Sequence, residues 1–151
     1  MIETQDNIET ILENLFSDHP DGDMAKSFIL GFNEYCHRID DIIDEKLTDA
    51  EVVCTTHMLA LNLFSSNFYR KYSDVLYPVI VNIHHTWLDS VQMEKSSNLQ
   101  SREQAVVLKS VGIEMLLMVV QILGGYEKRR KYSVLIRENN FRKQNPSLDI
   151  S

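Results

Sequence analysis

The sequence predicts an all-α protein, a single domain in which five or six helices pack as a bundle. The first observation is the scarcity of turn-forming residues: 5 glycines and 3 prolines in 151 residues are too few for a many-stranded sandwich or barrel. The second is that apolar residues recur at helical spacing along most of the chain. The third is that no repeat or flexible linker divides residues 1–151. We therefore expect one all-helical domain.

Two helices are predicted before residue 46. A short first helix ends at the turn-forming residues 18–22. Its apolar positions are Ile8, Ile11, Leu12, Leu15 and Phe16. A second helix, from about Asp23 to Glu45, is strongly amphipathic because its apolar residues fall on one broad face. These residues are Phe28, Ile29, Phe32, Tyr35, Cys36, Ile39, Ile42 and Ile43.

A third helix is predicted to begin at Thr48 and to run to about Tyr72. The residues Thr48 to Glu51 form a capping box, in which the threonine oxygen accepts from a free backbone N–H and the glutamate reaches back to the cap. Apolar residues line two sides of this helix. We therefore expect the helix to lie in the centre of the bundle, with His57 packed in the core.

Two or three more helices complete the bundle. Pro78 fits the first turn of a fourth helix, because the N–H that proline lacks would be unpaired there anyway. Residues 94–100 are the clearest loop. A second capping box, Ser101–Gln104, then begins a long fifth helix, which we expect to stop at Gly124–Gly125. A last helix is predicted from about Tyr126 to Phe141.

Charge is unevenly distributed along the chain. The 15 basic and 22 acidic residues give a net charge of −7, so a general affinity for nucleic acid is not expected. Residues 1–125 hold 8 basic and 19 acidic side chains, whereas residues 126–151 hold 7 and 3. The acidic body of the domain therefore ends in a basic C-terminal segment.

The features of a secreted or membrane protein are not found in the sequence. The N-terminal residues lack the basic and apolar regions of a secretory signal. The longest apolar stretch, Val111–Leu123, is shorter than the roughly 18 residues that span a bilayer, and it contains Glu114. Cys36 and Cys54 lie in apolar helical patterns and are expected to be buried thiols in a reducing compartment. We expect a cytoplasmic protein without a membrane span.

The most conspicuous polar feature is the acidic end of the predicted second helix. Carboxylates at positions i, i+1 and i+4 of a helix can converge on a hard divalent cation, and oxygen ligands favour Mg²⁺ or Mn²⁺. The candidate metal ligands are Asp40, Asp41, Asp44 and Glu45. These ions commonly bridge carboxylates to substrate phosphates. The alternative is an ordinary solvated face, since most of this charge lies opposite the apolar face of the helix.

The segment Tyr35–Glu45, with the sequence YCHRIDDIIDE, resembles the first aspartate-rich motif of squalene and phytoene synthases. In that all-helical family of isoprenoid synthases, the aspartates of a DDxxD motif bind Mg²⁺ that grips a prenyl diphosphate. The resemblance implies that Asp40, Asp41 and Asp44 are the metal ligands. It covers 11 of the 151 residues.

Glu114 is the most unusual charged residue of the predicted fifth helix, whose other residues are nearly all apolar. An ionised carboxylate is costly to bury unpaired, so Glu114 must be protonated, paired or bound to metal. One interpretation is a structural ion pair or hydrogen bond within the bundle, with His57 as a possible partner. The other is a ligand or a catalytic acid/base group.

Other polar residues could complete a site. His85 and Asp89 are one turn apart on the predicted fourth helix, so they could serve as a catalytic group and a metal ligand if they face the acidic end of the second helix. A solvated polar stripe is the alternative. Lys128, Arg129 and Arg130 could neutralise phosphate charge, or could form a patch for an anionic partner.

Two functions remain open at this point. The first is Mg²⁺-dependent binding, hydrolysis or transfer of a diphosphate-bearing small molecule such as a nucleotide or prenyl diphosphate, which leaves open whether the protein is an enzyme. The second is a non-catalytic helical module that meets a protein partner or forms a homodimer. They differ in whether the acidic stripe of the second helix faces a cavity with Asn82, His85 and Asp89, or faces bulk water.

Overall fold

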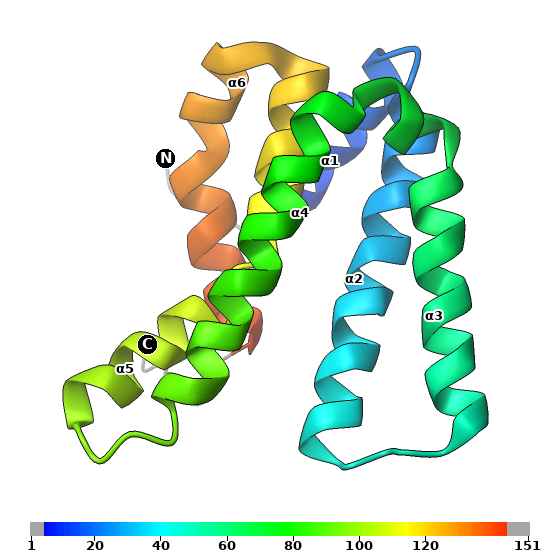
Figure 1. Ribbon diagram of the computed structural model, residues 1–151. Helices are drawn as coiled ribbons and strands as arrows, with labels where there is room; N and C mark the ends of the chain where they lie inside the picture. The colour runs from blue at the N-terminus through cyan, green and yellow to red at the C-terminus, as the bar shows by residue number, and fades with distance from the viewer. Residues whose placement is uncertain (1–4, 145–151) are drawn as a thin grey trace.

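The fold is all-helical, as predicted. The computed structural model describes the backbone of residues 5–144 and the side chains of residues 8–140, and this part of the chain contains no strand. The helices are α1 (Gln5–Asp18), α2 (Gly22–Asp44), α3 (Ala50–Ser65), α4 (Asn67–Met93), α5 (Leu99–Leu108) and α6 (Ile113–Gln144). The hairpin of α2 and α3 leans against α4 and α6, and α5 packs beside α4 (Figure 1).

The main core lies where α2, α4 and the first half of α6 meet. Aromatic rings of α2 and α4 pack together, with ring centres 5.4 Å apart for Phe28 and Phe68 and 5.0 Å apart for Phe68 and Tyr72. Met115 and Val119 of α6 are fully buried and complete this core. The predicted apolar face of the second helix therefore does form the core side of α2.

A smaller apolar cluster holds α1 against α6. It comprises Ile8, Leu15, Leu117, Val120 and Ile136. These residues come from α1 and from both the early and the late parts of α6. The cluster therefore joins the first and last helices of the described chain.

A buried carboxylate holds the turn between α1 and α2. Asp21 is only 7% exposed, and it accepts hydrogen bonds from Lys71 Nζ at 2.6 Å and from Tyr72 Oη at 2.5 Å. Tyr72 is also the residue at which α4 bends, with φ −116° and ψ 19°. The hydrogen bonds from Lys71 and Tyr72 hold the pKa of Asp21 below its ordinary value. This network ties the first turn of the chain to the bend in α4.

Replacing Asp21 with asparagine is expected to lower the thermal unfolding midpoint at pH 7 by a few degrees, because the amide keeps the shape but loses the charge paired with Lys71. The pKa of Asp21 is lower in the folded than in the unfolded state. Its contribution is therefore fully present above the unfolded pKa and is lost as pH falls through the folded pKa. Calorimetry on both proteins should show midpoints that converge in strong acid. An equal difference at every pH would contradict this origin.

The boundary between the third and fourth helices differs from the prediction. α3 ends at Ser65, so the expectation of one helix up to Tyr72 is wrong. Ser66 leaves the helical conformation, with ψ 151°, and its hydroxyl caps α4 by accepting from the N–H of Tyr69 at 3.3 Å. Pro78 lies inside α4 and not in its first turn.

The predicted fifth helix is two helices. Residues 109–112 form a turn that separates α5 from α6. α5 begins at Leu99, before the predicted capping box, because the side chain of Asn98 accepts from the backbone N–H of Gln100 at 2.8 Å. The predicted stop at Gly124–Gly125 is confirmed, since the helical conformation breaks at Gly125, with φ 81° and ψ 178°.

Beyond Gly125, α6 folds back on itself. Arg129 donates to Gln121 at 2.9 Å, and Arg137 pairs with Glu114 at 2.6 Å. Residues at similar distances before and after Gly125 therefore meet, and the two halves of α6 run antiparallel (Figure 1).

The expectation that the third helix is central is wrong. α3 packs against α2 and α4 only, at one side of the bundle (Figure 1). Its inner face is formed by Thr56, Ala60 and Leu63, which are buried. His57 is exposed and has no place in the core. The central positions belong to α2, α4 and α6, which supply the large apolar side chains of the core.

One stretch within Leu99–Asn140 is long and apolar enough to cross a membrane, by length and composition only. The turn at residues 109–112 interrupts the helix there. Met115, Leu117, Val119 and Val120, which belong to the first half of α6, are fully or almost fully buried in the bundle, whereas most of the apolar stretch is not buried. The absence of a membrane span and the cytoplasmic location stay predictions.

Candidate functional site

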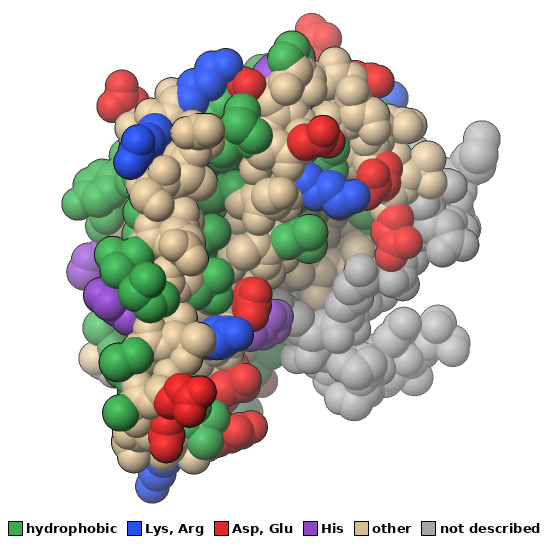
Figure 2. All heavy atoms as spheres, turned by 90° about the vertical axis from the view of Figure 1, so that its right-hand side faces the viewer, with side chains coloured by type: hydrophobic (Ala, Val, Ile, Leu, Met, Phe, Trp, Pro, Cys, Tyr) green, Lys and Arg blue, Asp and Glu red, His purple; other side chains and the backbone are tan. Residues whose placement is uncertain are grey.

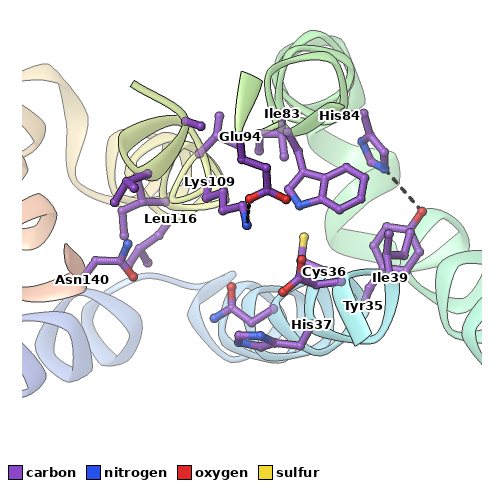
Figure 3. Close-up of a pocket in the computed structure, with 18 of the residues that line it drawn as sticks. Tyr35, Cys36, His37, Ile39, Ile83, His84, Glu94, Lys109, Leu116 and Asn140 are labelled. Carbon is purple, nitrogen blue, oxygen red and sulfur yellow. Dashed lines mark hydrogen bonds and ion pairs between the residues drawn. The ribbon is translucent and has the colours of Figure 1, made fainter. Parts of the chain in front are cut away.

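A cleft of about 760 Å³ lies between the second half of α2 and the wall formed by α4, α5 and the start of α6. Figure 3 shows Cys36 and His37 on the α2 side, facing Glu94, Lys109 and Leu116 across the space. Its volume falls within the range of small-molecule sites, roughly 300–1,000 Å³. The cleft combines apolar walls with several ionisable side chains, so it is the best-formed candidate for a ligand site.

Asp40 is the carboxylate of α2 that lines this cleft. Burial raises the pKa of Asp40 above its ordinary value, and the charge of Asp44, one turn further on, adds to the rise. Lys109 and the indole N–H of Trp87 act in the opposite direction without cancelling it. Asp40 therefore carries its charge in surroundings that disfavour it.

The basic residues of the cleft have partners within the protein. Lys109 forms an ion pair with Glu94 across the turn that links α4 to α5. Arg102 donates to the backbone oxygen of Ser96 at 2.9 Å. Arg102 belongs to α5 and Lys109 directly follows it, and the two side chains hold the loop between α4 and α5 in place.

A histidine on α4 is held by two contacts at the edge of the cleft. The Nδ1 of His84 lies 2.8 Å from the carbonyl oxygen of Ile80, an arrangement in which Nδ1–H donates. Its Nε2 can then accept from the hydroxyl of Tyr35, 3.4 Å away on α2 (Figure 3). This contact joins the two walls of the cleft.

The two cysteines differ in their surroundings. Cys36 lines the cleft, and burial, with a smaller effect of Asp40, raises the pKa of its thiol to about 12. Cys54 is exposed on α3, so the expectation that both thiols are buried is wrong for Cys54. It lies on the outer face of α3, because the core contacts of that helix come from its other side.

In dilute protein at pH 8, iodoacetamide is expected to alkylate Cys54 and to spare Cys36. A pKa of about 12 leaves on the order of one Cys36 thiol in ten thousand ionised at that pH. Peptide mass spectrometry of the folded protein measures the two rates, and the denatured protein, in which both thiols react, is the control. Equal rates in the folded protein would contradict the burial of Cys36.

The structure separates most of the predicted metal ligands from the cleft. Asp41, Asp44 and Glu45 are exposed, and acidic side chains gather at the lower end of the molecule in Figure 2, where α2 ends. Asp89 is exposed on α4. Among the described side chains, no group of three or more His, Cys, Asp or Glu residues is arranged to hold a metal ion. Of the predicted ligands, only Asp40 lines the cleft.

Neither of the two predicted catalytic residues lines the cleft. His85 is exposed on α4. Glu114 forms an ion pair with Arg137 at 2.6 Å and lies 4.0 Å from Arg129, beside a second cavity of about 600 Å³. His57 is not its partner, because α3 and α6 do not meet in the described structure.

The predicted phosphate-binding residues lie at the end of the molecule opposite the acidic end of α2. Lys128, Arg129 and Arg130 follow the break at Gly125, at the top of Figure 1, whereas α2 ends at the bottom. Lys128 and Arg130 are exposed. The basic residues that share the cleft with Asp40 are Arg102 of α5 and Lys109, which follows it. They were not predicted as site residues, because only the tertiary fold brings them close to α2.

Comparisons with known proteins found no match. No protein-family model, no curated protein and no solved structure is similar to the chain. The resemblance of residues 35–45 to the aspartate-rich motif of squalene and phytoene synthases stays a prediction.

Proposed function

We propose that this protein is a non-catalytic assembly module, in which the outer face of α3 packs against α3 of a second copy of the chain. The observation that carries the proposal is the composition of that face. A helix at the side of a bundle ordinarily presents charged residues to water. α3 has a single charged residue, Glu51, among its 16 residues.

The outer face of α3 is apolar along its length. Val53, Met58 and Leu61 are 45%, 53% and 48% exposed, and Cys54 and His57 lie exposed between them. At 100° per residue, these five side chains share one strip of the helix. Apolar side chains that form one strip mark an interaction surface more often than scattered ones do.

The charges at the two ends of the strip favour a second copy as the partner. The end near the start of α3 is acidic. The carboxylates of Asp44, Glu45, Asp49 and Glu51 are exposed there, beside one exposed base, Lys46. The other end is followed, beyond the turn at Ser66, by Arg70 and Lys71 of α4, of which Lys71 is already paired with Asp21. Figure 2, which faces this side of the molecule, shows hydrophobic and histidine side chains between an upper region with both basic and acidic side chains and a lower end that is mainly acidic.

An antiparallel pair of α3 helices matches both features. Related by a two-fold axis, the apolar strips face each other, and the acidic end of each copy lies against the basic end of its partner. The helix dipoles are also antiparallel in this arrangement. A parallel pair would instead bring like charges together.

Light scattering after size-exclusion chromatography tests the proposal. Wild type at micromolar concentration is expected to show twice the monomer mass, and Leu61→Lys at least a tenfold weaker dimer. Because Leu61 is already exposed in one copy, the variant is expected to unfold at the wild-type midpoint when both are monomeric. Val134→Lys is the matched control, since Val134 is 64% exposed on α6, away from the strip.

A wild-type protein that stays monomeric at high concentration would overturn the proposal. Alkylation of Cys54 offers a second measurement, because the thiol lies within the strip and is expected to react more slowly as the dimer forms. Equal rates at low and high concentration would contradict the interface.

Mg²⁺-dependent binding of a diphosphate stays a prediction of the sequence. Its support is that Asp40 shares the cleft with Arg102 and Lys109. The unfolding midpoint with EDTA, with Mg²⁺ and with Mg²⁺ plus pyrophosphate tests it. A rise that pyrophosphate enlarges, and that an Asp40→Asn, Asp44→Asn double variant lacks, would support it.

A further inference from the structure

We propose that the cleft between α2 and α4 binds a small organic cation, an amine with an apolar body, with Asp40 as its counter-ion and Trp87 beside it. This site is separate from the α3 surface. The inference rests on the volume of the cleft, on its apolar walls, and on which of its charged groups already have partners.

The walls of the cleft suit an apolar body. Ile39 of α2, Ile83 of α4 and Leu116 of α6 line it from three sides. The space of about 760 Å³ holds a molecule of the size of an aromatic amine. Burial of such a body against these side chains would contribute to affinity by the hydrophobic effect, at about 25 cal/mol per Å² of apolar surface.

Asp40 and Arg102 are the charged groups of the cleft that form no ion pair within the described structure. Lys109, whose charge lowers the pKa of Asp40, is itself paired with Glu94. Arg102 is turned to the backbone of the loop between α4 and α5. The burial that disfavours the carboxylate would be offset by a cation placed beside it.

Trp87 adds an aromatic group next to this carboxylate. Its indole N–H is close enough to Asp40 to act on the pKa of that carboxyl, which it lowers. The ring of Trp87 lines the same cleft. Ammonium groups are attracted to the faces of aromatic rings, and tryptophan binds them most strongly. A carboxylate beside an indole is therefore a suitable environment for an ammonium group.

The charges around the cleft disfavour an anion. The ion pair with Glu94, and to a smaller extent the charges of Asp44 and Asp40, raise the pKa of Lys109. Arg102 is a second cation of the cleft, so these three carboxylates face two basic side chains. A phosphate or carboxylate ligand would meet the repulsion of the carboxylates before it reached either base.

Trp87 is the single tryptophan of the chain, so its fluorescence reports on this cleft alone. The experiment titrates the full chain with phenethylamine, with the uncharged 2-phenylethanol, with phenylacetate, and with Mg²⁺ plus pyrophosphate. A saturable change in fluorescence is expected for phenethylamine, with affinity at least tenfold weaker for 2-phenylethanol and no binding of phenylacetate. Isothermal titration calorimetry of the same amine provides a measurement independent of the fluorophore.

The matched variants are Asp40→Asn and Asp41→Asn. They alter neighbouring carboxylates of α2, of which only Asp40 lines the cleft. Asp40→Asn is expected to weaken amine binding at least tenfold, and Asp41→Asn by less than twofold, with circular dichroism showing that both are folded. Equal loss in the two variants, no binding of the amine, or preferred binding of phenylacetate or Mg²⁺–pyrophosphate would each overturn the proposal.

Discussion

Replacing Gly22 with alanine is expected to destabilise the fold by about 3 kcal/mol or more, because the corner between α1 and α2 has no room for a side chain. A Cβ at Gly22 would lie 1.5 Å from the carbonyl oxygen of Phe16 and 2.5 Å from its carbonyl carbon. These are backbone atoms of α1, which cannot rotate away as a side chain can. Any relief must therefore shift α1 relative to α2 and weaken the contacts of Asp21 with α4.

Urea denaturation followed by circular dichroism measures this effect, with Gly112→Ala as the matched control. A Cβ at Gly112 meets nothing within 4 Å. The same substitution there is expected to be neutral or to stabilise by up to about 1 kcal/mol, since alanine restricts the unfolded chain. A Gly22→Ala variant as stable as the control would show that the corner is not as close as described.

Replacing Gly125 with alanine is expected to cost about 1–3 kcal/mol for a different reason. A Cβ there also meets nothing within 4 Å, so no atom obstructs it. The backbone angles, φ 81° and ψ 178°, lie in a region that essentially only glycine adopts. The cost is therefore conformational, and it falls on the turn that folds α6 back on itself.

A double-mutant cycle with Glu114→Gln tests whether this turn and the ion pair are coupled. If alanine at position 125 displaces the second half of α6, the pair between Glu114 and Arg137 is already weakened, and the two losses should not add. Urea midpoints of wild type, both single variants and the double variant measure this. A Gly125→Ala variant with wild-type stability would contradict the strained turn.

Much of the fold could be predicted from periodicity. The apolar face of α2 and the stop at Gly124–Gly125 are found where they were expected, because 3.6-residue spacing and glycine act locally. The helix starts were less accurate. The predicted capping residues are Thr48 and Ser101. The side chains that cap in the structure are Asp49, one residue after Thr48, and Asn98, three residues before Ser101. Several nearby polar residues can cap a helix, and tertiary contacts decide among them.

The candidate site was less predictable than the fold. Asp40 was expected to act with its neighbours on α2, but the helix turns Asp41 toward water. Lys109 and Arg102 reach the site from α5, across a distance in sequence that no local pattern reveals. Which helix faces the acidic end of α2 depends on how whole elements pack. For α3, two apolar sides predicted a central helix, and the structure covers only one of them.

The cluster that joins α1 to α6 has a consequence for how the chain folds. Ile8 and Leu15 find their apolar partners at Leu117, Val120 and Ile136, more than a hundred residues later. α1 also packs against α2, but Ile8 and Leu15 stay uncovered until the ribosome has synthesised α6. Closing so long a loop is slow compared with forming a helix. We expect the docking of α1 onto the completed α6 to be a late step in folding, and the nascent protein to be most prone to aggregation until that step is complete.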